Sequence, residues 1–117
     1  MPINDALLNA GATAMGTAAA YASIHTAQPN AAGNNESTAA RQLIDWSTAS
    51  AGDLALDAPL AFTGGAAGGP ATHLGLWSAP TAGTFYGYFP LTGDQAFNAA
   101  GEFTVTALAL TGSATGA

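Results

Sequence analysis

Apolar residues recur with helical spacing only at the start of the chain. Leu7, Leu8, Gly11 and Met15 fall roughly on one side of a helix in this segment. Asn4 is a good N-cap, since its side-chain oxygen can accept a hydrogen bond from a free amide of the first turn. The pattern predicts one short helix. We expect it to end near Gly11 or Gly16, because a glycine weakens a helix by about 1 kcal/mol relative to alanine.

From Tyr21 onward the spacing changes to an alternation of apolar and polar residues, which is typical of strands. Turns rich in Gly, Pro and Asn separate the alternating segments. Pro59 cannot donate to a strand ladder, so the third segment breaks or lies at an edge there. The segments are 21–26, 40–46, 52–62, 71–77, 84–91 and 102–111. This pattern predicts a mainly β fold, an antiparallel β-sandwich or small barrel with one short N-terminal α-helix.

The length of 117 residues suits one domain. We expect a helix or arm at 1–20, the β-sandwich at 21–111 and a C-terminal tail at 112–117. The chain contains no cysteine, which excludes disulfides and thiolate metal sites. Its stability therefore depends on packing, backbone pairing or association.

The stretch "THLGLWSAPTAGTFYGYFPL" at 72–91 is rich in aromatic residues and predicts a β-hairpin. Its Leu and Phe positions alternate onto one face and would fill the core: these are Leu74, Leu76, Phe85 and Phe89. Tyr86 and Tyr88 fall on the opposite face and are the best candidates for exposed aromatic residues. We also expect Trp46 and Trp77 to be largely buried and to hold the sandwich together.

Only 7% of the residues are charged, and the formal net charge is −6. The one basic residue, Arg41, cannot neutralise the phosphates of a nucleic acid or of an anionic membrane surface, so neither is an expected partner. No segment is long and apolar enough to predict a transmembrane helix. A surface this poor in charge suits a protein packed against other subunits, although a GC-rich genome would also favour such a composition.

The sequence offers few groups for catalysis or metal binding. His25 and His73 belong to no spaced ligand motif such as HxH or HExxH, and no GxSxG segment supplies a nucleophile. The carboxylates are scattered. We therefore predict no catalytic, cofactor or metal site, and we expect neither histidine to lie beside a serine–carboxylate pair.

Two segments, "YASIHTAQPNAAGNNESTAARQLIDW" and the 72–91 stretch, resemble a family of small virion structural proteins of tailed bacteriophages. Members are described as minor tail, tail-fibre-like or head-decoration proteins. The resemblance extends over about residues 1–110, and the matching positions include His25, Glu36, Arg41, Trp46, His73, Gly75 and Trp77. It implies a β-rich virion component that is not an enzyme and that has no established catalytic residues.

These observations favour a non-enzymatic accessory structural protein of a tailed-phage virion, assembled in the host cytoplasm. It would decorate the capsid or form part of the tail, and we favour the head because a short chain without fibre repeats suits a stand-alone clamp. Its expected partners are major capsid or tail subunits and further copies of itself, for example in a trimer. The subunit interface would use Ile3, Leu7, Leu8, Tyr86 and Tyr88.

Two other functions remain open. A carbohydrate-binding module for host attachment would expose Tyr86, Tyr88 or Trp77 in a coplanar row beside Asn and Asp residues. A small hydrolase would need His25 or His73 within hydrogen-bond reach of an acid and a serine.

Overall fold

The N-terminal helix begins at the predicted cap and runs further than predicted. The computed structural model describes residues 4–50, 52–91, 95–106 and 108–111. Helix α1 spans Asp5–Ala18, and the Asn4 side chain accepts a hydrogen bond from the Leu7 amide at 3.0 Å. Because α1 continues through Gly11 and Gly16, the predicted end near Gly11 is wrong and the one near Gly16 falls slightly short.

Gly16 stays within the helix because the packing of α1 requires a small residue there. A Cβ atom at this position would lie 2.9 Å from Leu54 Cδ1 and 3.1 Å from Trp46 Cδ1. The missing side chain lets α1 pack closely on β3 (Asp53–Ala55), the strand that contains Leu54. The packing thus outweighs the low helix propensity of glycine, which costs about 1 kcal/mol.

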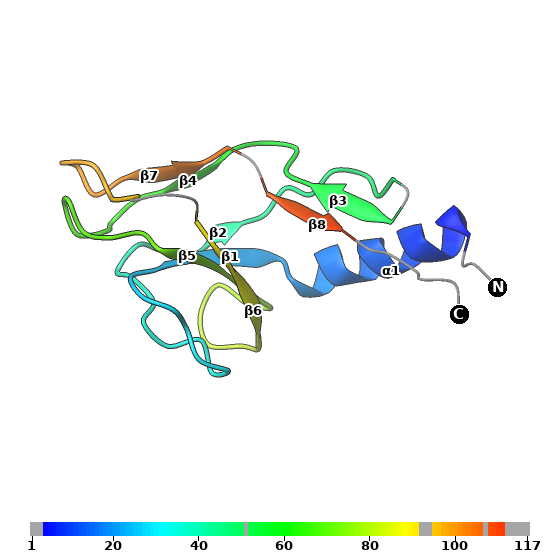
Figure 1. The fold of residues 1–117 in the computed structure, drawn as a ribbon, viewed down its shortest axis with the longest axis horizontal. Helices are drawn as coiled ribbons and strands as arrows, with labels where there is room; N and C mark the ends of the chain where they lie inside the picture. The colour runs from blue at the N-terminus through cyan, green and yellow to red at the C-terminus, as the bar shows by residue number, and fades with distance from the viewer. Residues whose placement is uncertain (1–3, 51, 92–94, 107, 112–117) are drawn as a thin grey trace.

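A four-stranded antiparallel sheet forms the body of the molecule (Figure 1). In spatial order its strands are β2 (Gln42–Leu43), β1 (Tyr21–His25), β5 (His73–Trp77) and β6 (Phe85–Pro90). The strands predicted at 21–26, 71–77 and 84–91 are therefore confirmed. In this order β6 is an end strand, with β5 as its one neighbour among the described strands.

Two further antiparallel pairs complete the β structure. β3 pairs with β8 (Ala109–Thr111), and β4 (Leu60–Phe62) pairs with β7 (Phe103–Val105). The sequence predicted one strand at 52–62 and one at 102–111, and the structure divides each of them in two. The first division falls around Pro59, where the sequence predicted a break, because proline has no amide to donate.

The strand predicted at 40–46 is mostly wrong, because the chain changes its pairing partner within this segment. Only Gln42–Leu43 forms a strand with β1. Further along, Asp45 accepts a backbone hydrogen bond from Asp57 at 2.8 Å. The segment therefore connects the four-stranded sheet to the chain around β3, and the mainly β antiparallel fold with one N-terminal helix is confirmed as predicted.

The main core lies between the four-stranded sheet and the β4–β7 pair. Figure 1 shows β4 and β7 lying above β1 and β5. Ile24 and Leu74 contribute from the sheet and Phe62 from β4, and each of these side chains is at most 1% exposed. Leu74 and Leu76 are both buried in this core, as the alternation of the 72–91 stretch predicted.

A register shift in the β5–β6 pair changes which way Phe85 points. Leu76 pairs with Gly87 but Trp77 pairs with Phe85, so Tyr86 is an extra residue on β6. Phe85 consequently packs against Trp77, with ring centroids 5.0 Å apart, on the face of the sheet away from the main core. The prediction that Phe85 shares the core face with Phe89 is wrong, because a β-bulge displaces one residue from the alternation.

Candidate interaction surface

Four of the five large apolar side chains that are exposed among the described residues belong to α1 and β6. Leu7 is 60% and Met15 45% exposed on α1, while Tyr86 is 52% and Tyr88 39% exposed on β6. The fifth, Leu43, lies on β2, at the opposite end of the four-stranded sheet. Apolar exposure is thus concentrated on two elements, α1 and β6.

The structure places the predicted interface residues unequally. Tyr86 and Tyr88 are exposed, as the sequence predicted. Leu7 is exposed as well, whereas Leu8 is half-buried. Ile3 lies outside the described residues.

Met15, Tyr86 and Tyr88 border one hollow of about 470 Å³, which Ala18, Leu76 and Phe89 also line. None of these residues carries a charge at neutral pH. Leu7 lies about 12 Å from Met15 along the helix axis, at about 1.5 Å per residue. The structure therefore joins Met15 to the two tyrosines and leaves Leu7 apart from them. The sequence could not predict which side of α1 is exposed, because the helix has only one charged residue, Asp5, to distinguish a solvent-facing side.

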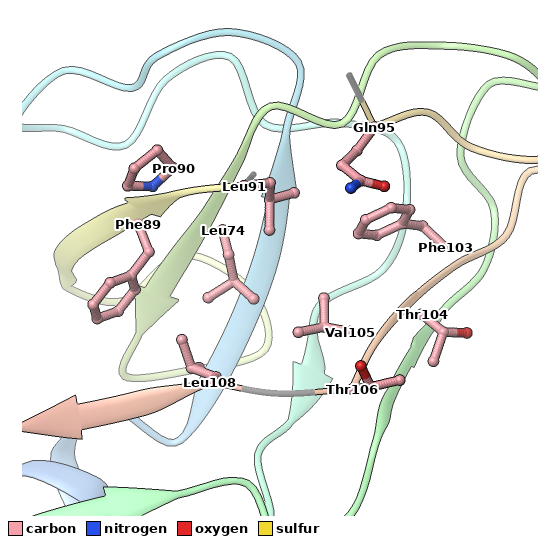
Figure 2. A pocket seen from close by; sticks show the side chains of 10 residues that line it. All are labelled: Leu74, Phe89, Pro90, Leu91, Gln95, Phe103, Thr104, Val105, Thr106 and Leu108. Carbon is pink, nitrogen blue, oxygen red and sulfur yellow. The ribbon is translucent and has the colours of Figure 1, made fainter. Parts of the chain in front are cut away.

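β6 also borders a second hollow, of about 440 Å³, at the gap between its end and β7. Figure 2 shows Phe89, Pro90 and Leu91 on one side of this gap, with Phe103, Thr104 and Val105 on the other. On the face away from the core, Tyr86 and Tyr88 line a further hollow of about 510 Å³ together with Pro29 and Asn30. Hollows that β6 helps to line therefore lie on both of its faces.

Away from this surface, three polar side chains form a sealed network between β1 and β5. Trp77 Nε1 donates to Ser23 Oγ at 2.8 Å, and Ser23 Oγ lies 2.7 Å from His25 Nε2. His25 Nδ1 lies 2.8 Å from the carbonyl oxygen of Asn34. Ser23 and His25 are fully buried, and no buried side-chain nitrogen or oxygen of the described residues lacks a hydrogen-bond partner.

These contacts determine the tautomer of His25. A carbonyl oxygen can only accept, so Nδ1 carries the proton and Nε2 accepts from the Ser23 hydroxyl. Burial lowers the pKa of His25, and this outweighs the opposing effects of the Asn34 hydrogen bond and the charge of Glu36. The neutral ring is therefore the form that the network holds.

Arg41 holds a loop and a turn against the outer face of the same sheet. Its Nε and Nη2 donate to the two carboxylate oxygens of Glu36 at 2.9 and 3.0 Å. Its Nη1 donates to the carbonyl oxygens of Ala79 and Ala82, in the connection between β5 and β6. The guanidinium carbon lies 3.6 Å from the centroid of the Trp77 ring, in a cation–π contact.

Several of the residues that carry the resemblance in the sequence, namely His25, Glu36, Arg41 and Trp77, meet in this region. Gly75 belongs to it as well, because a Cβ atom there would lie 2.5 Å from His25 Nε2 and 2.7 Å from Ser23 Oγ. Trp77 is 6% exposed, as predicted, and so it cannot belong to an exposed row of aromatic rings. Trp46 packs against the core and donates to the Ala19 carbonyl at 3.1 Å, but it is less completely buried than Trp77.

A serine does lie within hydrogen-bond reach of His25, which the sequence did not predict. Ser23 and His25 alternate onto one face of β1, but only the pairing with β5 brings Trp77 to them. The third group of this arrangement is the carbonyl of Asn34 instead of a carboxylate. His73, the other histidine, is half-buried and places its Nδ1 2.8 Å from Thr72 Oγ1.

Within the described ranges, no three His, Asp or Glu side chains gather closely enough to hold a metal ion. No helix in the described part of the chain is long and apolar enough to cross a membrane.

Comparison with protein families places the chain among the structural components of bacteriophage virions. Residues 2–113 match the family described as podophage GP4 fiber I protein gp80. The chain belongs to this family, so it is a phage fibre protein and a virion component. The match supports a place in the tail and gives no support to the preference for head decoration. A comparison with curated proteins finds no match.

Proposed function

We propose that the chain is a non-enzymatic building block of a phage fibre that binds its neighbours through the exposed apolar surface of α1 and β6. The observation that carries this proposal is the concentration of exposed Leu7, Met15, Tyr86 and Tyr88 on these two elements. Leu8, which is half-buried near the start of the helix, and Ile3, which lies outside the described residues, belong to the same proposed interface. The partners are other virion subunits and further copies of the chain.

Charge supports an apolar contact. Arg41, the one Lys or Arg side chain, is engaged by Glu36 and Trp77 within the molecule, so it is not available to a partner. Exposed ion pairs contribute only about 0–1 kcal/mol in any case. Burial of apolar surface, at about 25 cal/mol per Å², is then the main term that favours assembly.

The buried histidine supports a non-enzymatic role. Ser23 and His25 are each 0% exposed, and the Ser23 hydroxyl already accepts the Trp77 N–H. A substrate would have to displace Trp77 or the loop that contains Asn34 before it reached this pair. The arrangement therefore satisfies buried polar groups and offers no access to a reacting molecule.

Binding of the protein to fibre-less particles, measured over a series of salt concentrations, tests the proposal. We expect the wild-type chain to stay bound at moderate salt, because apolar contacts are not screened. The double variant Leu7→Asp, Tyr88→Asp should lose binding, whereas Leu43→Asp, on the far end of the sheet, should bind normally. Release by moderate salt together with normal binding of the double variant would contradict an apolar contact.

A carbohydrate-binding function is the second candidate, and one observation favours it. Tyr86 and Tyr88 share the outer hollow with Asn30, so two aromatic rings and an amide border the same space. Aromatic faces and amides suit a neutral sugar. Titration calorimetry with host-surface glycans, for the wild-type chain and Asn30→Ala, would show saccharide-dependent heat only if this candidate is right.

A further inference from the structure

β6 forms one edge of the four-stranded sheet, and no described strand pairs with its outer side. The Leu91 amide donates to the Thr72 carbonyl at 2.8 Å, and Phe89 pairs with Leu74. In an antiparallel pair, hydrogen bonding to a given neighbour alternates along the strand. The backbone N–H and C=O of Tyr88 therefore point away from β5, toward the edge where no described strand lies.

The middle of this edge lacks the features that usually prevent edge-to-edge pairing. Natural edge strands carry charged residues, prolines or bulges. β6 contains no charged residue, and its bulge at Tyr86 and its proline at Pro90 lie toward its two ends. The segment between them, Gly87–Tyr88–Phe89, is left open to a partner strand.

Gly87 leaves a gap in this segment. A Cβ atom at Gly87 would meet no other atom within 4 Å, and Gly87 lines the hollow bounded by Met15 and Ala18. An aromatic side chain from a neighbouring strand can cover a glycine on an edge strand. An aromatic residue on a partner strand, directly opposite Gly87, would fill this gap.

We propose that β6 of one copy pairs antiparallel with β6 of a second copy, with Tyr88 of each copy opposite Tyr88 of the other. This register places Phe89 of each copy opposite Gly87 of the other. The two Tyr88 residues form the hydrogen-bonded pair, so Gly87 and Phe89 form the closer non-hydrogen-bonded pairs beside it. The inference rests on the proposed function and names the partner of its β6 surface.

A second copy fits this edge better than a basic partner does. The sequence Gly87–Tyr88–Phe89 is complementary to itself about Tyr88, so one two-fold axis covers both glycines at once. β6 has no carboxylate, and the pairing brings no like charges directly opposite each other even though each copy has a net charge of −6. Because the contact is two-fold, it predicts a dimer as the first unit of assembly and not a trimer.

The exposed area indicates a weak dimer. Tyr86 is 52%, Tyr88 39% and Met15 45% exposed. With roughly 200 Å² for each large side chain, these residues offer on the order of 250 Å² to a partner. A standard interface buries about 800 Å² per partner. We therefore expect association to be visible only at high protein concentration in the isolated chain, and to be favoured in the fibre by neighbouring contacts.

Sedimentation equilibrium over a concentration series tests the dimer. Tyr88→Glu places two carboxylates opposite each other at the two-fold axis, and we expect at least about a tenfold weaker association, since like charges directly opposite are destabilising. Leu43→Glu adds the same charge to an exposed position on β2 and should associate like the wild type. Urea unfolding of both variants checks that they are folded.

Single cysteines test the register, because the chain has no cysteine of its own. The Cα atoms of a hydrogen-bonded antiparallel pair lie about 5.5 Å apart, which suits a disulfide. Tyr88→Cys should therefore form a covalent dimer on mild oxidation much faster than Leu43→Cys. Equal rates, together with a monomeric wild type at every concentration, would overturn the pairing. If that protein still binds particles through α1 and β6, the proposed function stands without it.

Discussion

The indole N–H of Trp77 donates to the hydroxyl of Ser23 across two neighbouring strands, at 2.8 Å. The same hydroxyl donates to His25, 2.7 Å away. One small side chain therefore satisfies two buried rings, and the ring of His25 in turn holds the Asn34 loop. This relationship makes Ser23 the centre of the network on the outer face of the sheet.

Replacing Ser23 with alanine should destabilise the protein strongly. The change leaves Trp77 Nε1 and His25 Nε2 buried without partners, and each such group costs about 1–3 kcal/mol. We expect the free energy of unfolding, measured in urea, to fall by about 2–4 kcal/mol. Ser50→Ala, at an exposed serine, should change it by less than about 0.5 kcal/mol. Similar losses for both variants would show that the buried hydrogen bonds of Ser23 contribute no more to stability than an exposed serine does.

Adding one methyl group at two different glycines should have opposite effects. In Gly75→Ala the new Cβ would lie 2.5 Å from His25 Nε2, so β5 or the histidine must shift and stability falls. In Gly11→Ala the Cβ meets nothing within 4 Å, and we expect a gain of up to about 1 kcal/mol from better helix propensity. Thermal unfolding of the two variants measures both effects, and a more stable Gly75→Ala would contradict the close packing described for β5.

Stability should decrease as the pH falls below that of neutral solution. The pKa of His25 is lowered in the folded protein, chiefly by burial, so the unfolded chain binds a proton more readily. The contribution of His25 is complete above the unfolded value of about 6.5 and is lost progressively as the pH falls through the lower folded pKa. Besides Glu36, the charges of His73 and Arg41 act on this ring.

Urea unfolding between pH 7.5 and pH 5.5 separates this effect from that of the carboxylates, because groups with pKa values of about 4 remain charged there. Nitrogen chemical shifts of the imidazole, followed over the same range, should show that His25 is still neutral at a pH just below about 6.5. They should also show that its one ring proton is on Nδ1. A ring that takes up its proton at or above about 6.5 would contradict the buried network.

Arg41→Lys should loosen the loop and the turn that Arg41 joins. Lysine keeps the charge but cannot bind both Glu36 oxygens, two carbonyl groups and the Trp77 face at once. We expect a loss of about 1–3 kcal/mol in urea unfolding, since the Arg41 side chain is only 8% exposed. Gln42→Lys, at the adjacent half-buried residue, is the control. If Arg41→Lys left the free energy of unfolding unchanged, a positive charge at this position would be sufficient to hold the loop and the turn.

The sequence predicts three strands of the four-stranded sheet well, but it does not predict how short β2 is or where β6 bulges. Strands β1, β5 and β6 follow from alternation between turn residues, and the cap at Asn4 follows from hydrogen-bond chemistry. The bulge at Tyr86 leaves no mark in the alternation, so the direction of Phe85 could not be predicted. The low helix propensity of Gly16 predicts a helix end there. The packing that keeps Gly16 in the helix could not be predicted, because the residues that pack on it, Leu54 and Trp46, lie far away in the sequence.

The candidate surface was predictable in part for the same reasons. Tyr86 and Tyr88 were placed on the outside, and both are exposed. The network of Ser23, His25 and Trp77 depends on residues 54 positions apart, and only the pairing of β1 with β5 brings them together. The outer side of α1 could not be identified, since a helix of Ala, Gly and Thr has little polarity to distinguish its sides.

The position of Arg41 has a consequence for proteolysis. Trypsin cleaves after lysine or arginine, and this chain offers it one bond, between Arg41 and Gln42. The Arg41 side chain is held by Glu36 and Trp77, and the strand β2 begins at the next residue. Trypsin can therefore cleave this bond only after the Arg41 contacts and the strand β2 have opened. The rate of this single cleavage then reports the local opening of the segment around Arg41 and β2.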